Sequence, residues 1–263
     1  MSAAPSSGLS ERDERQLDDV GISRLEAERQ LDLLASPPAA LHLDRPCTVG
    51  DGIFGLETLS DRSRLDSWKA AAASGRLTRF VPASGAASRM FDAAQTIHSS
   101  SEISRPQLTE RAARGDSAAQ AVAELIARIG ELPFAADLLA TEPLVGIGPE
   151  AIGSTESVRR LLDAMLTPAG LDLPALPKGL IPFHLYPSGS RTAFEEHLAE
   201  GRDLLVDREA VSRFHFTVPE SRQAAFESLA SRFASQHQMA LQVGFSHQEP
   251  ATDTLAISAG GEI

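Results

Sequence analysis

From residue 176 onward, strand-like and helix-like stretches alternate, and this alternation limits the possible folds more than any other feature. Short apolar stretches containing residues that favour β-strands predict strands at Leu180–Tyr186, Phe214–Val218 and Met239–Phe245. Helices are expected between them, over Thr192–Ala199 and from Pro219 to about Ser235. Strands separated by helices pair in parallel through crossover connections. The sequence therefore predicts an α/β fold with a mostly parallel sheet and flanking helices.

The first of these helices carries signals at both ends. Thr192 and Glu195 have the spacing of a capping box, in which each side chain bonds the backbone of the other residue. Gly201 follows the last periodic positions, where glycine commonly ends a helix. We therefore expect the helix to begin at Thr192 and to stop at Gly201.

The rest of the chain is predicted to be mainly helical. We expect residues 1–9 to form a disordered lead and residues 10–75 a helical N-terminal extension. Apolar residues within Ser10–Leu34 recur at helical intervals with a break near Gly21, which indicates two short helices, and Ser60–Ser74 resumes the helical pattern. An α/β domain then spans 76–263 and contains a helical insertion, 100–170, with amphipathic helices at Ser117–Ile129 and Thr155–Leu166.

A run of small residues before an arginine is the strongest functional signal. The stretch Phe80-Val-Pro-Ala-Ser-Gly-Ala-Ala-Ser-Arg-Met90 follows a predicted strand, Leu77–Pro82, and precedes a predicted helix, Ala87–Ile97. Small side chains allow a phosphate chain to approach the backbone amides, and Arg89 adds a positive charge with two-pronged geometry. The same pattern also occurs where a helix packs closely on a sheet. Nucleotide binding and close packing therefore both remain open here.

A second cation lies ~90 residues further on. Lys178 follows Pro177 and directly precedes a predicted strand, where a lysine is well placed to meet a phosphate as a point charge. An exposed loop lysine would give the same local sequence. The pattern alone leaves both interpretations open.

The charge balance limits the possible partners. The chain has 24 Lys and Arg against 36 Asp and Glu, a formal net charge of −12. This field repels a nucleic acid backbone or an anionic membrane surface, but it does not exclude a small anion that arrives with a metal ion. We therefore expect small-molecule ligands, with no nucleic acid polymer and no membrane as partner.

The compartment is inferred from cysteine content and hydropathy. Cys47 is the single cysteine, which rules out an internal disulfide, and we expect it to be a small buried hydrophobic residue. No apolar run reaches the ~20 residues that span a bilayer, and the N-terminus lacks the pattern of a signal peptide. We expect a cytoplasmic protein.

The order of these parts resembles a known enzyme class. The small-residue loop ending in Ser88-Arg89-Met90, then Pro177-Lys178 before a strand, then Thr192-Ala-Phe-Glu-Glu-His-Leu198 is similar to the sugar nucleotidyltransferases. Their pattern is Leu-Ala-x-Gly-x-Gly-Thr-Arg-Met, Pro-Lys and Thr-Pro-Leu-Glu. The segment Phe245-Ser-His-Gln248-Glu-Pro250 resembles the Phe-x-Gln-x-x-Pro of uridine-diphosphate-sugar pyrophosphorylases, whose glutamine faces uracil. The resemblance implies a Rossmann-like fold.

A closer resemblance covers nearly the whole chain. Five segments resemble the bacterial family catalogued as domain of unknown function 4301. They are Val-Pro-Ala-Ser-Gly-Ala-Ala-Ser-Arg-Met, Pro-Lys-Gly-Leu, Gly-Ser-Arg-Thr-x-Phe-Glu-Glu-His-Leu, His-Phe-Thr-Val and Pro-Ala-Thr-Asp-Thr-Leu-Ala. Members of that family continue to a Pro-Gly-Gly-His-Gly-type loop, whereas this chain stops at Ile263. We therefore expect an incomplete domain whose exposed sheet edge could mediate a dimer.

The chain departs from the transferase pattern in two other places. Ala87 stands where the loop has its second glycine, which adds a methyl group near the phosphates. Gln248 lies three residues after the phenylalanine instead of two, so its position relative to uracil differs.

The resemblance implies roles for individual residues. Arg89 would hold the β- and γ-phosphates and Lys178 the α-phosphate, with Mg²⁺ as cofactor. The nucleotide-binding set would be Ala83, Ser84, Gly85, Ala86, Ala87, Ser88 and Gln248. Asp253, beyond a strand end, is the candidate metal ligand, and an aspartate capping its own turn is the alternative.

The histidines and Ser84 are the other candidates for a functional site. We interpret His184, His197 and His215 as structural because they lack metal-ligand spacing. Ser84 lacks the Gly-x-Ser-x-Gly frame of a nucleophile turn, which makes a hydrolase a poor choice.

Two functional hypotheses follow. The first is an enzyme that binds a nucleoside triphosphate or nucleotide-sugar and transfers a nucleotidyl group to a sugar phosphate. The second is a catalytically silent nucleotide-binding or protein-interaction module, derived from a longer family member.

Overall fold

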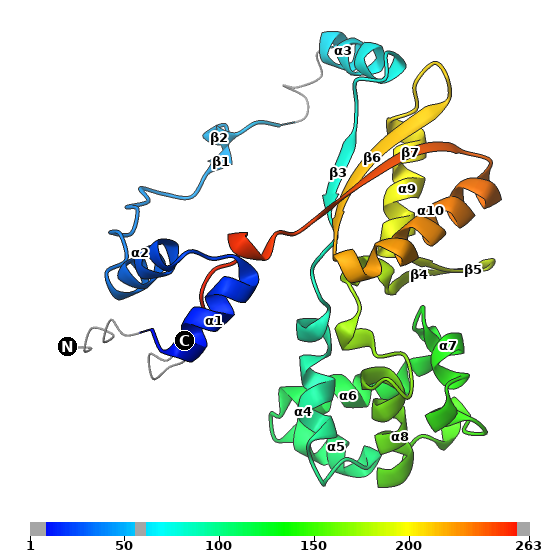
Figure 1. Ribbon diagram of the computed structural model, residues 1–263. Coiled ribbons are helices and arrows are strands. Elements are labelled where there is room, and N and C mark those ends of the chain that lie inside the picture. The colour runs from blue at the N-terminus through cyan, green and yellow to red at the C-terminus, as the bar shows by residue number, and fades with distance from the viewer. Residues whose placement is uncertain (1–8, 56–61, 257–263) are drawn as a thin grey trace. The chain divides into compact units, whose positions relative to one another are not determined.

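A computed structural model describes residues 9–55 and 62–256, and it divides into two compact units (Figure 1). One unit comprises residues 1–67 and 248–263, and the other comprises residues 68–247. The division falls within helix α3, Arg62–Ala73.

The first unit contains the two helices expected near the N-terminus. Helix α1 is Glu11–Val20 and α2 is Arg24–Ala35, separated at Gly21, whose φ of 76° ends α1 in the left-handed conformation. Residues Leu17, Ile22 and Ala27 form a small core with the partly buried Leu255. The backbone N–H of Leu255 donates to Gln30 Oε1 at 2.8 Å. Residues near the C-terminus therefore complete this small helical unit.

The other elements of this unit are short. Strands β1, Thr48–Val49, and β2, Gly52–Ile53, flank a tight turn, and Pro250–Thr252 forms a 3₁₀ turn. Cys47 is exposed, so the expectation that it is a buried hydrophobic residue was wrong. It precedes strand β1, both residues of which are exposed.

The second unit is built on a three-stranded sheet. Strands β3, Arg79–Pro82, β6, Val211–Val218, and β7, Ala240–His247, lie in the order β3-β6-β7, and both pairings are parallel. The mixed α/β class and the parallel pairing are therefore confirmed. In the register, Pro82, Thr217 and Ser246 stand side by side at the carboxyl end of the sheet.

Two helices cover one face of this sheet (Figure 1). They are α9, Ala193–Leu204, and α10, Gln223–His237. Every second residue of β6 is buried, because Phe214, Phe216 and Val218 point toward these helices. The partners across the core are Phe194, Leu198, Phe226 and Phe233.

One predicted strand lies outside this sheet. Strand β4, Pro182–Tyr186, pairs antiparallel with β5, Gly189–Thr192, as a separate hairpin. The expectation that Leu180–Tyr186 joins the parallel sheet was therefore wrong. Pro187 and Ser188 reverse the chain directly after β4, and Gly189 takes a φ of 126°, so the nearest pairing partner is the strand that follows.

The expected end of helix α9 also differs. Its capping box is formed, with Thr192 and Glu195 bonded to each other, but the helix passes through Gly201 and ends at Leu204. Gly201 is buried inside the helix and faces the ring of Phe214. This glycine therefore allows close packing and does not terminate the helix.

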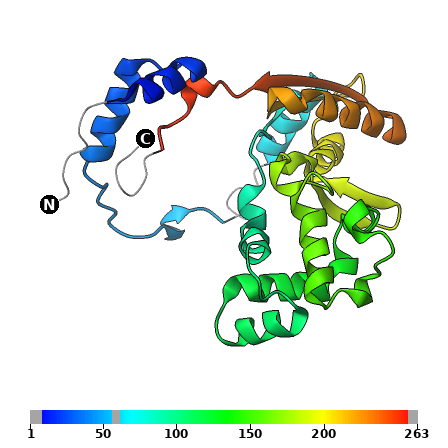
Figure 2. The same ribbon diagram turned by 60° about the horizontal axis from the view of Figure 1, so that its bottom comes forward.

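Residues between strand β3 and the β4–β5 hairpin form a helical lobe, whose helices group together in both views (Figures 1 and 2). The helices are α4, Asp92–His98, α5, Arg105–Ala113, α6, Ser117–Ala127, α7, Ala135–Leu139, and α8, Thr155–Leu166. They enclose one apolar core that includes Leu108, Val122 and Leu161. A helical segment within 100–170 is thus present.

Short 3₁₀ turns connect the elements of this unit. They are Ser88–Phe91, Ile129–Glu131, Glu142–Leu144, Pro149–Ala151, Leu173–Ala175, Lys178–Leu180 and Glu220–Arg222. The helix expected from Ala87 is therefore a 3₁₀ turn followed by the short helix α4. Among the described helices, none has the length and apolar character needed to cross a membrane.

Candidate functional site

The small-residue loop and the segment that contains Lys178 lie side by side. The backbone N–H of Lys178 donates to the carbonyl oxygen of Gly85 at 3.0 Å, and the N–H of Ala87 donates to the carbonyl oxygen of Leu176 at 3.1 Å. These bonds frame an antiparallel bridge between Ala86 and Pro177. Two segments that are distant in the sequence therefore form one junction, which we call the loop–lysine junction, residues 83–89 with 176–178.

Each side of the junction supplies one exposed cation. Arg89 lies on the 3₁₀ turn Ser88–Phe91, and Lys178 begins the turn Lys178–Leu180. Both residues are exposed, and neither forms an ion pair with a residue that the structure describes. Among the described residues these two cations have no carboxylate partner, although the chain has a net charge of −12. They remain available to an anionic ligand.

The loop amides divide into two groups. The N–H of Ala83 donates to Thr217 at 2.7 Å, and that of Ala87 donates to Leu176, so these two amides hold the loop in place. The methyl group of Ala87 is fully buried. The amides of Gly85, Ala86 and Ser88 have no hydrogen-bond acceptor within residues 9–55 and 62–256, and all three residues are exposed. A ligand at the junction would meet this second group.

The glycine at the centre of the loop is open to solvent. A Cβ atom added to Gly85 would meet no atom within 4 Å. The fold therefore does not require a glycine here for packing. Close approach of a ligand to the backbone is a remaining reason for a glycine at this position.

Gln248 and Asp253 belong to the first compact unit. The side-chain amide of Gln248 donates to Asp253 Oδ1 at 2.8 Å, so the predicted base-reading residue and the predicted metal ligand contact each other. In the described parts of the chain, no group of three or more His, Cys, Asp or Glu side chains could hold a metal ion.

Polar residues at the carboxyl end of the sheet were not predicted as part of a site. His215 Nε2 lies 2.9 Å from Ser246 Oγ, and Thr217 Oγ1 lies 3.4 Å from the same hydroxyl. The ring of Phe80, three residues before the loop, stacks on His215 with centroids 5.8 Å apart. The sequence of β6 contained a signal for these polar residues. A central parallel strand is usually apolar throughout, whereas apolar and polar residues alternate along β6.

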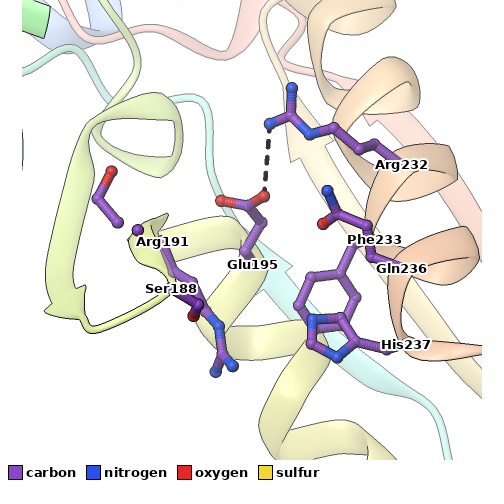
Figure 3. Close-up of a pocket in the computed structure, with 9 residues that line it drawn as sticks. Ser188, Arg191, Glu195, Arg232, Phe233, Gln236 and His237 are labelled. Atoms are coloured by element: carbon purple, nitrogen blue, oxygen red, sulfur yellow. Dashed lines mark ion pairs between the residues drawn. The ribbon is translucent and has the colours of Figure 1, made fainter.

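A pocket of about 540 Å³ lies elsewhere in this unit, between the β4–β5 hairpin and helices α9 and α10 (Figure 3). The hairpin contributes Ser188, Ser190 and Arg191, and α9 contributes Glu195. Arg232, Gln236 and His237 line the opposite wall on α10. None of these lining residues belongs to the loop–lysine junction.

Burial changes the protonation of one histidine beside the sheet. The pKa of His197 is lowered, chiefly because burial disfavours the charged imidazole and also because Arg79 lies nearby. Its Nδ1 atom is buried and has no hydrogen-bond partner among the described residues. His197 is therefore neutral near pH 7 and has a packing role in α9.

This shift predicts a pH dependence of stability. As pH falls below the ordinary histidine pKa of about 6.5, the unfolded chain binds a proton before the folded chain does, so stability falls. The fall continues down to the lowered folded-state pKa and ends there. We expect thermal midpoints to drop between pH 7.5 and 5.5, with a smaller drop in His197→Gln. The exposed His42→Gln should keep the native profile, and an equal drop in His197→Gln would contradict the assignment.

Comparison with known proteins adds one finding. A family model described as "Domain of unknown function (DUF4301)" matches residues 10–263. No curated protein and no solved structure matches the chain.

Proposed function

Because the chain belongs to the DUF4301 family, a domain of unknown function, we propose a function from the chemistry of the loop–lysine junction. The junction binds the triphosphate of a nucleotide, and the protein transfers a nucleotidyl group to a sugar phosphate. The observation that carries this proposal is the hydrogen-bonded pairing of Gly85 with Lys178. It joins an open amide loop to a cation at the carboxyl side of a parallel sheet, where ligands of open α/β sheets bind.

The reaction follows from the charges involved. An oxygen of the sugar phosphate attacks the α-phosphorus, and the bond from that phosphorus to the bridging oxygen of the β-phosphate breaks. Pyrophosphate leaves with the electron pair of that bond. Lys178 stabilises charge on the α-phosphate, while Arg89 and the amides of Gly85, Ala86 and Ser88 hold the rest of the chain.

Magnesium is expected to bind together with the triphosphate. Mg²⁺ uses one or two carboxylates together with phosphate oxygens, so it does not need a cluster of three protein ligands. The ion would supply charge neutralisation on the phosphates.

Gly85→Val tests nucleotide binding at the junction. The added side chain meets no protein atom at its Cβ, so folding should be unaffected, but it occupies the space in which a phosphate would approach the amides. We expect the affinity for a magnesium–nucleoside triphosphate to fall by about tenfold or more, the size of one or two lost hydrogen bonds to a charged group. Calorimetric titration with ATP, GTP, CTP and UTP measures it.

Gly130→Val is the matched control, because Gly130 is also exposed with open space at its Cβ. It should leave nucleotide affinity within twofold of the parent. The proposal fails if the parent protein binds none of the four nucleotides, or if Gly85→Val binds as tightly as the parent. Binding without pyrophosphate exchange would support the second hypothesis, a catalytically silent nucleotide-binding module.

A further inference from the structure

The groups exposed at the loop–lysine junction are suited to phosphates rather than to a base. They are backbone amides and the side chains of two cations. Gln248, the residue predicted to face the base, belongs to the first compact unit, where its side-chain amide donates to Asp253. A nucleotide held at the junction by its phosphates therefore needs a surface for its base within the second unit.

An exposed aromatic ring lies on the strand that leads into the loop. Val81 packs against the core under α9 and α10, so its neighbour Phe80 points to the opposite face of the sheet. The Phe80 side chain is 61 % exposed. Gly85 follows Phe80 by five residues, so their Cα atoms lie no more than about 18 Å apart. An extended nucleoside triphosphate can bridge this distance.

Neighbouring residues fix the position of this ring. Phe80 and His215 are partners in the register of the sheet, and their rings stack with centroids 5.8 Å apart and planes 20° apart. His215 Nε2 lies 2.9 Å from Ser246 Oγ. Gly244 leaves room for the imidazole, because a Cβ atom there would lie 3.0 Å from His215 Nδ1. The Phe80 ring is thus ordered in advance, which lowers the entropic cost of binding to it.

One face of the Phe80 ring is turned away from His215. Strand β3 is the outermost strand of the sheet that the structure describes, so no described strand lies beside this outer face (Figure 1). Flat aromatic ligands bind such a face by offset stacking, and nucleobases stack on phenylalanine in this way. The outer face of Phe80 therefore offers a stacking surface at the base of the small-residue loop.

We propose that the base of the nucleotide stacks on the outer face of Phe80 while the phosphates occupy the loop–lysine junction. This inference rests on the function proposed above and adds the recognition of the base to it. Stacking does not depend on the donors and acceptors of the base, because every base has a π face. Phe80 therefore contributes to the binding of each of the four nucleoside triphosphates.

Phe80→Ala tests the stack with two ligands, ATP and inorganic triphosphate, each with magnesium. Only ATP carries a base, so we expect its affinity to fall by about fivefold or more, the loss of one base–aromatic stack. The affinity for inorganic triphosphate should stay within twofold of the parent. Gly85→Val, in contrast, should weaken the binding of both ligands. Calorimetric titration of the full chain measures the affinities, and thermal melts establish that the variants fold.

A tryptophan at position 80 reports the contact directly. Trp68 is the single tryptophan of the chain, so the double variant Trp68→Phe/Phe80→Trp has its only indole at the proposed stack. Saturating ATP should quench its fluorescence, because a stacked base quenches an indole, whereas inorganic triphosphate should not. Its affinity for ATP should stay within about threefold of the parent, since the indole keeps the stacking face. Absence of quenching by bound ATP would place the base elsewhere.

Phe183→Ala is the matched control, because Phe183 is also an exposed phenylalanine on a strand, with the ring of His184 beside it. It should leave both affinities within twofold of the parent. If folded Phe80→Ala binds ATP as tightly as the parent while Gly85→Val does not, the stack is refuted and the junction stands. Equal weakening of both ligands by Phe80→Ala would also refute the stack. If the parent binds neither ligand, the function proposed for the junction fails, and the stack fails with it.

Discussion

Lys178→Ala is expected to lower the rate of nucleoside triphosphate–pyrophosphate exchange by about a hundredfold or more. A cation at the α-phosphate acts mainly in the transition state, and loss of one group that stabilises developing charge typically costs a factor of 10²–10³. Lys178 is exposed and its backbone makes the bond to Gly85, so the substitution removes the charge and leaves the junction intact. Exchange is measured with labelled pyrophosphate, magnesium and a hexose 1-phosphate as acceptor.

The sequence offers an unusually clean control for this experiment. It contains two lysines, Lys69 and Lys178, and Lys69 is an exposed residue of α3. Lys69→Ala should exchange at the parent rate, and Lys178→Arg should recover part of the activity because it keeps the charge with different geometry. Arg89→Ala is expected to raise KM more than it lowers kcat, since the proposed function places Arg89 on the outer phosphates. Parent-level exchange in Lys178→Ala would refute the role of this lysine.

The elements that could be predicted are those whose signals are local. The capping box at Thr192 and Glu195 fixes the start of α9, and the break at Gly21 separates α1 from α2. The parallel sheet follows from strands spaced by helices, although β4 turned out to pair with β5. The two-residue turn after Tyr186 places β5 next to β4. Pairing with this nearby strand costs less loop-closure entropy than pairing with a strand that is distant in the sequence.

The loop–lysine junction and the pocket on α10 differ in how far the sequence reveals them. The loop–lysine junction has a local signal on each side, the small residues of 83–88 and the Pro177-Lys178 pair, and the fold brings them together. The pocket between the β4–β5 hairpin and α10 has none. Arg191 and Arg232 come from different elements, and each is an ordinary surface arginine in its own segment. Only the packing of α10 against the hairpin places them on one cavity, so no spacing in the sequence could show it.

Gly201→Ala is expected to destabilise the second unit by about 2 kcal/mol, although alanine is the better helix former. The exchange of glycine for alanine inside a helix is worth up to about 1 kcal/mol in favour of alanine. The added Cβ, however, would lie 2.1 and 2.4 Å from two ring carbons of Phe214, which real Cβ atoms do not tolerate. Phe214 is itself buried and stacks on Phe216, so its ring has little room to move, and overpacking of this kind costs about 1–3 kcal/mol or more.

A double-mutant cycle establishes whether this contact is the cause. Phe214→Leu removes the ring atoms that the new methyl group would strike, so Gly201→Ala should cost at least about 1 kcal/mol less in that background than alone. Urea denaturation followed by circular dichroism measures each variant. Gly130→Ala, where the Cβ meets nothing within 4 Å, should leave stability nearly unchanged. If the effects of the two substitutions are additive, the contact with the Phe214 ring is not the cause. Gly201 would then be needed for its backbone conformation near the end of the helix, as the sequence pattern predicted.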